Sequence, residues 1–151
     1  MTAPATTRGA APSRPAHVLV CVAGAEDDLL LMRQAWSWAG RLGAALTVLH
    51  VLPGGAGGCR EEAIAADRMF AAAIGAPLVE LPAYSVLEGI AEFAAGRAVT
   101  HIVLSERSAR WPAARQPLSR ALAERLPGME ILIYGRPPSR PEAATTAGGF
   151  R

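Results

Sequence analysis

The chain has 151 residues, 51% of them hydrophobic, which is the size of one ordinary domain with enough apolar side chains to bury a substantial core. Its formal charge of +2 comes from arginines in the terminal segments. Residues 16–135 carry ten arginines against twelve acidic residues, and this balance argues against a nucleic-acid-binding face. All fifteen basic residues are arginine, which excludes a catalytic Schiff-base lysine and any phosphate loop that depends on lysine.

The two ends of the chain differ in composition from its middle. Residues 1–15 and 136–151 are rich in Ala, Pro, Thr, Gly and Arg without hydrophobic periodicity, so we predict two disordered tails around one domain at residues 16–135. No stretch reaches the roughly 18 consecutive apolar residues of a membrane span, and no signal-peptide pattern opens the chain. Cys21 and Cys59 have neither metal-ligand nor disulfide spacing and are interpreted as free thiols. We therefore expect a cytoplasmic protein without membrane insertion.

Apolar runs alternate with helical patterns along the domain. A strand, a helix and a strand are predicted at 17–22, 27–42 and 45–51, which is a βαβ opening. Asp27 and Asp28 favour the positive N-terminal end of the helix, and Gly43 is suited to end it. A second helix is expected at about 60–74, followed by a short strand at 78–81.

The second half of the domain continues the same alternation. Ser85 and Glu88 have the spacing of a capping box, in which each side chain satisfies the other residue's free backbone N–H, so a helix is predicted from there to about Gly96. The remaining elements are a strand at 101–104, an arginine-rich loop, a helix at about 117–126 and a last strand at 130–134.

The strands are continuously apolar rather than alternating. This pattern favours an α/β fold in which helices cover both faces of a parallel sheet. Right-handed crossovers then predict a five-stranded doubly wound sheet in the order 3-2-1-4-5. In such folds the ligand crevice lies beyond the carboxyl ends of the strands, where the strand order reverses. Residues 23–26 and 105–110 should meet there.

Three sequence motifs resemble the universal stress protein family, and most closely the universal-stress-like domain of Kdp-type potassium-sensing histidine kinases. They are Val-Leu-Val-Cys-Val-Ala-Gly at 18–24, Arg-Leu-Gly-Ala with a following Leu-His-Val at 41–51, and Ser-Glu-Arg-Ser-Ala-Arg-Trp running into Pro-Leu-Ser at 105–119. The resemblance covers residues 17–134. It implies a Rossmann-like fold of the adenine nucleotide alpha hydrolase type.

The chain departs from the pattern that ATP-binding members of the family carry. That pattern is G-x2-G-x9-G-[ST], with an acidic residue after the first strand. Here Ser105, Ser108 and Leu118 stand at the three glycine positions, and Ala23 stands where the acid would be. Only Ser119 matches. Since Leu118 adds a side chain where backbone N–H groups would approach a phosphate, the sequence weighs against stable ATP binding.

A nucleotide site is still a hypothesis that the residues allow, with no catalytic or metal-ligating residue assigned. The candidate residues are Gly24, Ala25, Val51, Ser105, Arg107, Ser108, Arg110 and Ser119. The resemblance implies that Val51 lies against the base. Arg107 and Arg110, with Arg115, could hold the phosphate of ATP, a cyclic dinucleotide or an acidic partner, or they could form a solvated loop. Trp111 either stacks on a base or on Arg110, or packs over the end of the sheet.

Other motifs favour structural interpretations. The glycines at 54–58 lack a following Lys-Ser/Thr and are interpreted as a flexible linker. His50 and His101 lie in or beside apolar strands without a ligand partner at suitable spacing, and are interpreted as structural. The acidic pairs at 27–28 and 61–62 are interpreted as charges that complement helix dipoles.

No arrangement of nucleophile and base is visible, so an enzyme is not expected. The leading hypothesis is a regulatory, universal-stress-like module that senses a nucleotide in stress or potassium signalling. The alternatives are an interaction module with a degenerate ATP site that binds a signalling kinase, and a weak ATPase. The last strand, at 130–134, would lie at the sheet edge, where unpaired backbone groups invite a second copy, so a homodimer is expected.

Overall fold

The computed structural model describes residues 15–54 and 61–135. Its centre is a five-stranded sheet in the order β3-β2-β1-β4-β7, in which every neighbouring pair is parallel. The strands are β1 (His17–Cys21), β2 (Ala45–Pro53), β3 (Leu78–Ala83), β4 (His101–Ser105) and β7 (Glu130–Tyr134). Because β7 is the last strand of this sheet, the predicted order 3-2-1-4-5 is confirmed.

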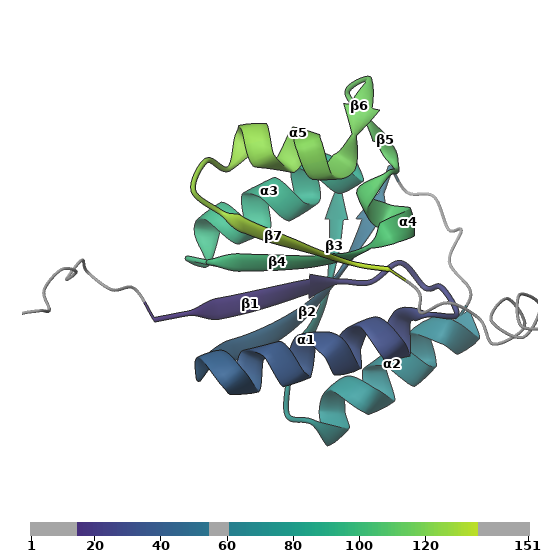
Figure 1. The fold of residues 1–151 in the computed structure, drawn as a ribbon. Helices are drawn as coiled ribbons and strands as arrows, with labels where there is room; N and C mark the ends of the chain where they lie inside the picture. Colours follow the sequence, from purple (N-terminus) through teal and green to yellow (C-terminus); the bar gives the residue numbers. More distant parts are fainter. Residues whose placement is uncertain (1–14, 55–60, 136–151) are drawn as a thin grey trace, which may run out of the picture.

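Helices cover both faces of the sheet (Figure 1). The long helices are α1 (Asp28–Leu42), α2 (Glu61–Ala73), α3 (Val86–Gly96) and α5 (Leu118–Arg125). In Figure 1, α1 and α2 lie below the sheet, and α3 and α5 lie above it. Among the described residues, no helix is long and apolar enough to cross a membrane.

The sheet has one hydrophobic core on each face, because successive residues of a strand point to opposite faces. Leu19, Leu49 and Ile102 pack with the inner sides of α3 and α5. Val20 and Val48 pack on the other face with Met32 of α1 and with residues of α2. Strands with a buried side chain on each face read as continuous apolar runs, which explains the pattern in the sequence.

The sequence signals for the helix ends are largely confirmed. Gly43 ends α1 with a left-handed φ of 63°, and the Ser85 hydroxyl accepts the Glu88 N–H at 3.1 Å at the start of α3. The reciprocal half of the predicted capping box is replaced by another contact. The Glu88 carboxylate accepts two hydrogen bonds, at 2.9 and 3.0 Å, from the guanidinium of Arg125 on α5. This ion pair lowers the pKa of Glu88 from its usual range.

The arginine-rich segment after β4 is not the loop that the sequence predicts. It forms a short helix, α4 (Glu106–Ala109), and a two-stranded antiparallel hairpin of β5 (Pro112–Ala113) and β6 (Gln116–Pro117). The Ser105 hydroxyl starts α4 by accepting the Ser108 N–H at 3.0 Å. The prediction missed this hairpin because its turn residues, Ala114 and Arg115, adopt φ values of 52° and 69° without being Gly or Asn.

Several sequence predictions lie outside the described residues. They are the two predicted tails, apart from Pro15 of the first, most of the glycine segment at 54–58, and Cys59.

Candidate functional site

A hollow lies at the carboxyl ends of β1, β2 and β4. It has a volume of about 260 Å³, and we name it the strand-end cavity. Cys21, Leu49 and Val51 of the sheet line it, and α3 adds Val86 and Ile90. Its other lining residues are Val22, Ala23, His50, Leu52, Pro53, Leu104, Ser108, Trp111 and Leu118. The position agrees with the crevice expected for this strand order.

The predicted site residues do not all meet at this cavity. Val51 and Ser108 line it, and Trp111 stands at its edge with 55% of its surface exposed. The other six candidates are absent from its described walls. They are Gly24, Ala25, Ser105, Arg107, Arg110 and Ser119.

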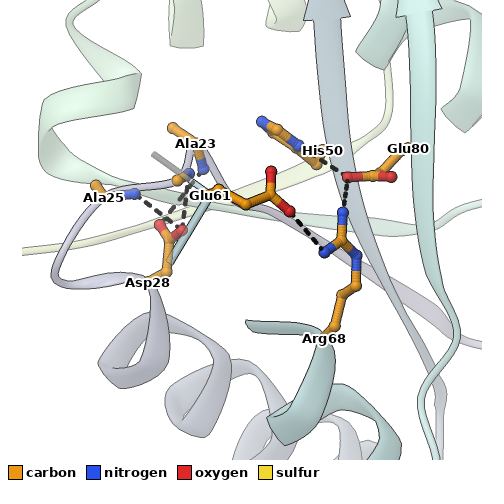
Figure 2. Close-up of polar contacts among 8 residues, drawn as sticks. Ala23, Ala25, Asp28, His50, Glu61, Arg68 and Glu80 are labelled. Atoms are coloured by element: carbon orange, nitrogen blue, oxygen red, sulfur yellow. Dashed lines mark hydrogen bonds and ion pairs between the residues drawn. The ribbon is translucent and has the colours of Figure 1, made fainter. Parts of the chain in front are cut away.

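Gly24 and Ala25 already have a partner for their backbone N–H groups. The carboxylate of Asp28, at the start of α1, accepts these two N–H groups at 2.9 and 3.0 Å and that of Ala23 at 3.4 Å (Figure 2). Gly24 enables the turn with a φ of 74°. Asp28 is only 4% exposed. Asp28 therefore does more than complement the helix dipole, because it takes the place of an anion in this cradle of amides.

Ser105 does not line the strand-end cavity. It lines a second hollow of about 180 Å³ together with Gln34 of α1 and Tyr134 of β7. Its hydroxyl is also committed to the start of α4. A shared role for Ser105 and Val51 in holding one small ligand has no geometric support among the described residues.

The arginines lie on the surface rather than around the cavity. Arg107 and Arg115 are exposed, and Arg110 has a 3.9 Å ion pair to Glu106 one helical turn before it. The Arg110 and Glu106 side chains are 73% and 55% exposed, so water and salt screen this pair strongly.

Leu118 fills the position where an ATP-binding relative would have its last glycine. Its side chain is 1% exposed, belongs to the core under α3 and α5, and lines the strand-end cavity. Its N–H donates to the carbonyl of Trp111 at 2.8 Å. Ser119 follows in the first turn of α5 and is half-buried. The Leu118 side chain is therefore committed to the core, and its N–H to the carbonyl of Trp111.

The cysteine of the cavity wall is not a reactive thiol near neutral pH. Cys21 is a free, buried thiol, as predicted, and burial raises its pKa to about 12, so the thiolate is not populated near neutral pH. His101 is structural, since its Nδ1 lies 2.7 Å from the Thr100 hydroxyl. Within residues 15–54 and 61–135, no cluster of three or more His, Cys, Asp or Glu could hold a metal ion.

Two buried polar residues differ from the sequence interpretation. His50 is buried, at 4% exposed, as a structural histidine would be, but its Nδ1 makes no hydrogen bond in the described structure. Asp67 of α2, which the sequence analysis missed, is 1% exposed and lies within hydrogen-bonding range of Asp28. The sequence carried a signal for this burial. Asp67 lies three residues after Ile64 and four before Ala71, which places it on the buried stripe of α2.

Solved structures with the same architecture are universal stress proteins. A universal stress protein in complex with cAMP has a TM-score of 0.60 at 20% identity, and the match covers 82% of this chain and 98% of that one. The chain has the fold of the universal stress proteins.

Two further matches come from Archaeoglobus fulgidus, both at 21% identity and both covering 78% of this chain. One universal stress protein has a TM-score of 0.54, with 92% of that chain covered. The other, in complex with dAMP, has a TM-score of 0.52, with 96% covered. No protein-family model matches the sequence, and no curated protein matches it either. The likeness to universal stress proteins is therefore one of fold.

Proposed function

We propose that this chain is a universal-stress-like regulatory module that binds the base of an adenine nucleotide in the strand-end cavity. The observation that carries this proposal is an apolar cavity at the carboxyl ends of β1, β2 and β4. Two universal stress proteins of the same fold are described in complex with cAMP and dAMP. The module acts by binding rather than by turnover, and no residue is assigned to ATP hydrolysis.

The cavity suits a base better than a whole nucleotide. At about 260 Å³ it is close to the lower limit of small-molecule pockets, which begin at roughly 300 Å³. Val51, Leu49 and Ile90 provide apolar walls for a flat ring. Trp111 stands at the edge of the cavity, where it can stack on a base or on the ribose. We propose that the sugar and the phosphates lie outside.

The phosphates would then contribute little to affinity. The amides of Gly24 and Ala25 bind Asp28, and the Leu118 side chain fills the position of the missing glycine. Arg107 and Arg110 remain as exposed cations, whose attraction for a phosphate is screened by salt. Adenosine and AMP should therefore bind with similar affinity at physiological ionic strength.

Thermal unfolding with adenosine, AMP, cAMP, ATP and cyclic di-AMP tests the proposal. A ligand at 100 times its dissociation constant should stabilise the folded state by about 2.7 kcal/mol. The Ala23→Trp variant should lose this stabilisation, because residue 23 is exposed at the wall of the cavity, where a large side chain blocks entry. The Arg107→Ala, Arg110→Ala double variant should retain most of it.

The matched control is Ala72→Trp, which places the same side chain at an exposed position of α2 on the opposite face of the sheet. It should respond to ligand as the unaltered protein does. If no ligand at millimolar concentration shifts the unfolding temperature of the unaltered protein, the nucleotide hypothesis is wrong for these compounds.

The second candidate is an interaction module that binds no nucleotide and contacts a signalling kinase. It is favoured by the occupied amide cradle and by Leu118, since both fill the anion side with the chain's own groups. The link to potassium or stress signalling rests on the sequence resemblance. Absence of any ligand effect in the unfolding experiment would favour this candidate.

We also propose a homodimer that pairs β7 with its copy. β7 is an edge strand of the sheet, and its Ile133 side chain is 48% exposed. Ile133→Glu should convert the dimer to a monomer, because it places two like charges at the paired edge. Light scattering after size exclusion would give the mass. The control Met69→Glu alters another exposed apolar residue, on α2, and should remain dimeric. A monomeric unaltered protein would contradict the proposal.

A further inference from the structure

Two carboxyl groups face each other under the sheet, between α1 and α2. Asp28 and Asp67 are 4% and 1% exposed and lie within hydrogen-bonding range of one another. They are 39 positions apart in sequence, so only the packing of α2 against α1 brings them together. We name them the carboxyl pair.

The carboxyl pair can be stable only if it holds a proton. Ionised carboxylates accept hydrogen bonds and donate none. Two ionised carboxylates in contact would therefore repel each other, and in a buried position water would not screen the repulsion. Asp28 already accepts three backbone N–H groups, a role that needs acceptor oxygens and no proton. The proton therefore belongs on Asp67, which can donate it to Asp28. Burial first, and then the contact with Asp28, raise the pKa of Asp67 to about 9.

The surrounding charges do not neutralise the pair. Arg68, the neighbour of Asp67 on α2, directs its guanidinium to Glu80 at 2.8 Å and to Glu61 at 3.4 Å (Figure 2). His50 of β2 is on the same face of the sheet, and its Nδ1 lies 3.8 Å from a Glu80 carboxylate oxygen. With Arg68, the residues His50, Glu80 of β3 and Glu61 of α2 form a separate set of charged and titratable groups that pair with one another. One oxygen of Asp67 has no hydrogen-bond partner in the described structure.

The carboxyl pair is joined to the strand-end cavity by the loop between β1 and α1, residues 22–27. Asp28 holds the amides of Ala23, Gly24 and Ala25, and Val22 and Ala23 form part of the cavity wall. We propose that Asp28 and Asp67 share one proton, and that this proton holds the 22–27 loop in the conformation that walls the cavity. An effect of this proton on ligand binding rests on the proposed function, whereas its effect on the conformation of the 22–27 loop does not.

The sign of the pH effect follows from where the proton is bound. Between about pH 4 and pH 9 the folded chain keeps the Asp67 proton while the unfolded chain has lost it. The stability that the pair contributes is thus fully present below the ordinary aspartate pKa. It is lost as the pH rises from there through the pKa of Asp67 in the folded chain. One proton of difference changes the unfolding constant tenfold per pH unit.

The test compares the unaltered protein with Asp67→Asn from pH 6 to pH 8 without ligand. Asparagine can still donate a hydrogen bond to Asp28 but cannot titrate. The ratio of the two unfolding constants, unaltered protein over variant, should rise at least tenfold over this range. Asp27→Asn, which alters the adjacent acid, should retain the pH dependence of the unaltered protein. A constant ratio between unaltered protein and Asp67→Asn would overturn the proposal, as would loss of the pH dependence in His50→Gln alone.

Two measurements on the unaltered protein keep the proposal testable if a variant does not fold. The infrared spectrum at pH 7 should contain the carbonyl band of one protonated carboxylic acid in the folded state, and its absence would overturn the proposal. Hydrogen-exchange protection of the Gly24 and Ala25 amides should fall above pH 9 relative to that of the sheet amides. Neither measurement needs a ligand, so failure of nucleotide binding leaves both results interpretable.

Discussion

Replacing Leu118 with alanine should destabilise the protein by roughly 2–5 kcal/mol, the range for removing a large aliphatic side chain from a packed core. Leu118 is 1% exposed and packs in the core between the sheet and the helices α3 and α5. The loss should be large because the side chain also borders the strand-end cavity, so the space left behind joins a hollow that already exists. Urea unfolding at neutral pH would measure the change.

A matched control separates core packing from helix propensity. Leu42→Ala makes the same substitution at the end of α1, where the side chain is 36% exposed, and should cost less than about 1 kcal/mol. Equal losses in the two variants would contradict the view that Leu118 supports the cavity wall. The enlarged cavity of Leu118→Ala should still accept adenosine, which links this variant to the ligand experiment.

Replacing Asp28 with alanine should lower the free energy of unfolding by on the order of 3 kcal/mol. Buried N–H donors that lose a charged acceptor stay out of water with no hydrogen bond in compensation. The amides of Gly24 and Ala25 would lose their acceptor, and Asp67 would lose the group that faces it. The effect should be visible both in the free energy of unfolding and in faster hydrogen exchange at these two amides.

Asp27→Ala is the control for Asp28→Ala. Asp27 precedes the helix and makes no side-chain capping hydrogen bond, so its removal should change stability by no more than about 0.5 kcal/mol. If Asp28→Ala were as mild as Asp27→Ala, the 22–27 loop would not depend on the carboxylate, and the proton-linked loop inferred above would lose its basis.

The sheet and its four long helices could be predicted from sequence because their signals are local. Continuous apolar runs mark buried parallel strands, and Gly43 and Ser85 mark helix ends through backbone conformation and a side-chain cap. Connection rules then limit the strand order, so the position of the cavity at the strand ends could be expected as well. Val51, which the family resemblance implies would lie against a base, lines this cavity.

The candidate site was harder to predict because side-chain partners are not a local property. The sequence suggested that Gly24, Ala25 and the arginines would face a ligand, whereas the amides bind Asp28 and the arginines lie on the surface. The hairpin after α4 was missed because its turn carries neither Gly nor Asn. Asp67 was missed because one acid in a helical stripe acquires meaning only from what packs against it.

The sequence by itself determined the alternation of strands and helices, their amphipathic faces and the end of the sheet where a cavity can form. Tertiary structure alone decided which polar groups meet near that end: Asp28 on the amides of the 22–27 loop, and Asp67 against Asp28. The physical reason is separation along the chain. Hydrophobic periodicity and caps act over a few residues, whereas burial of a charge depends on groups that only the folded sheet brings into contact.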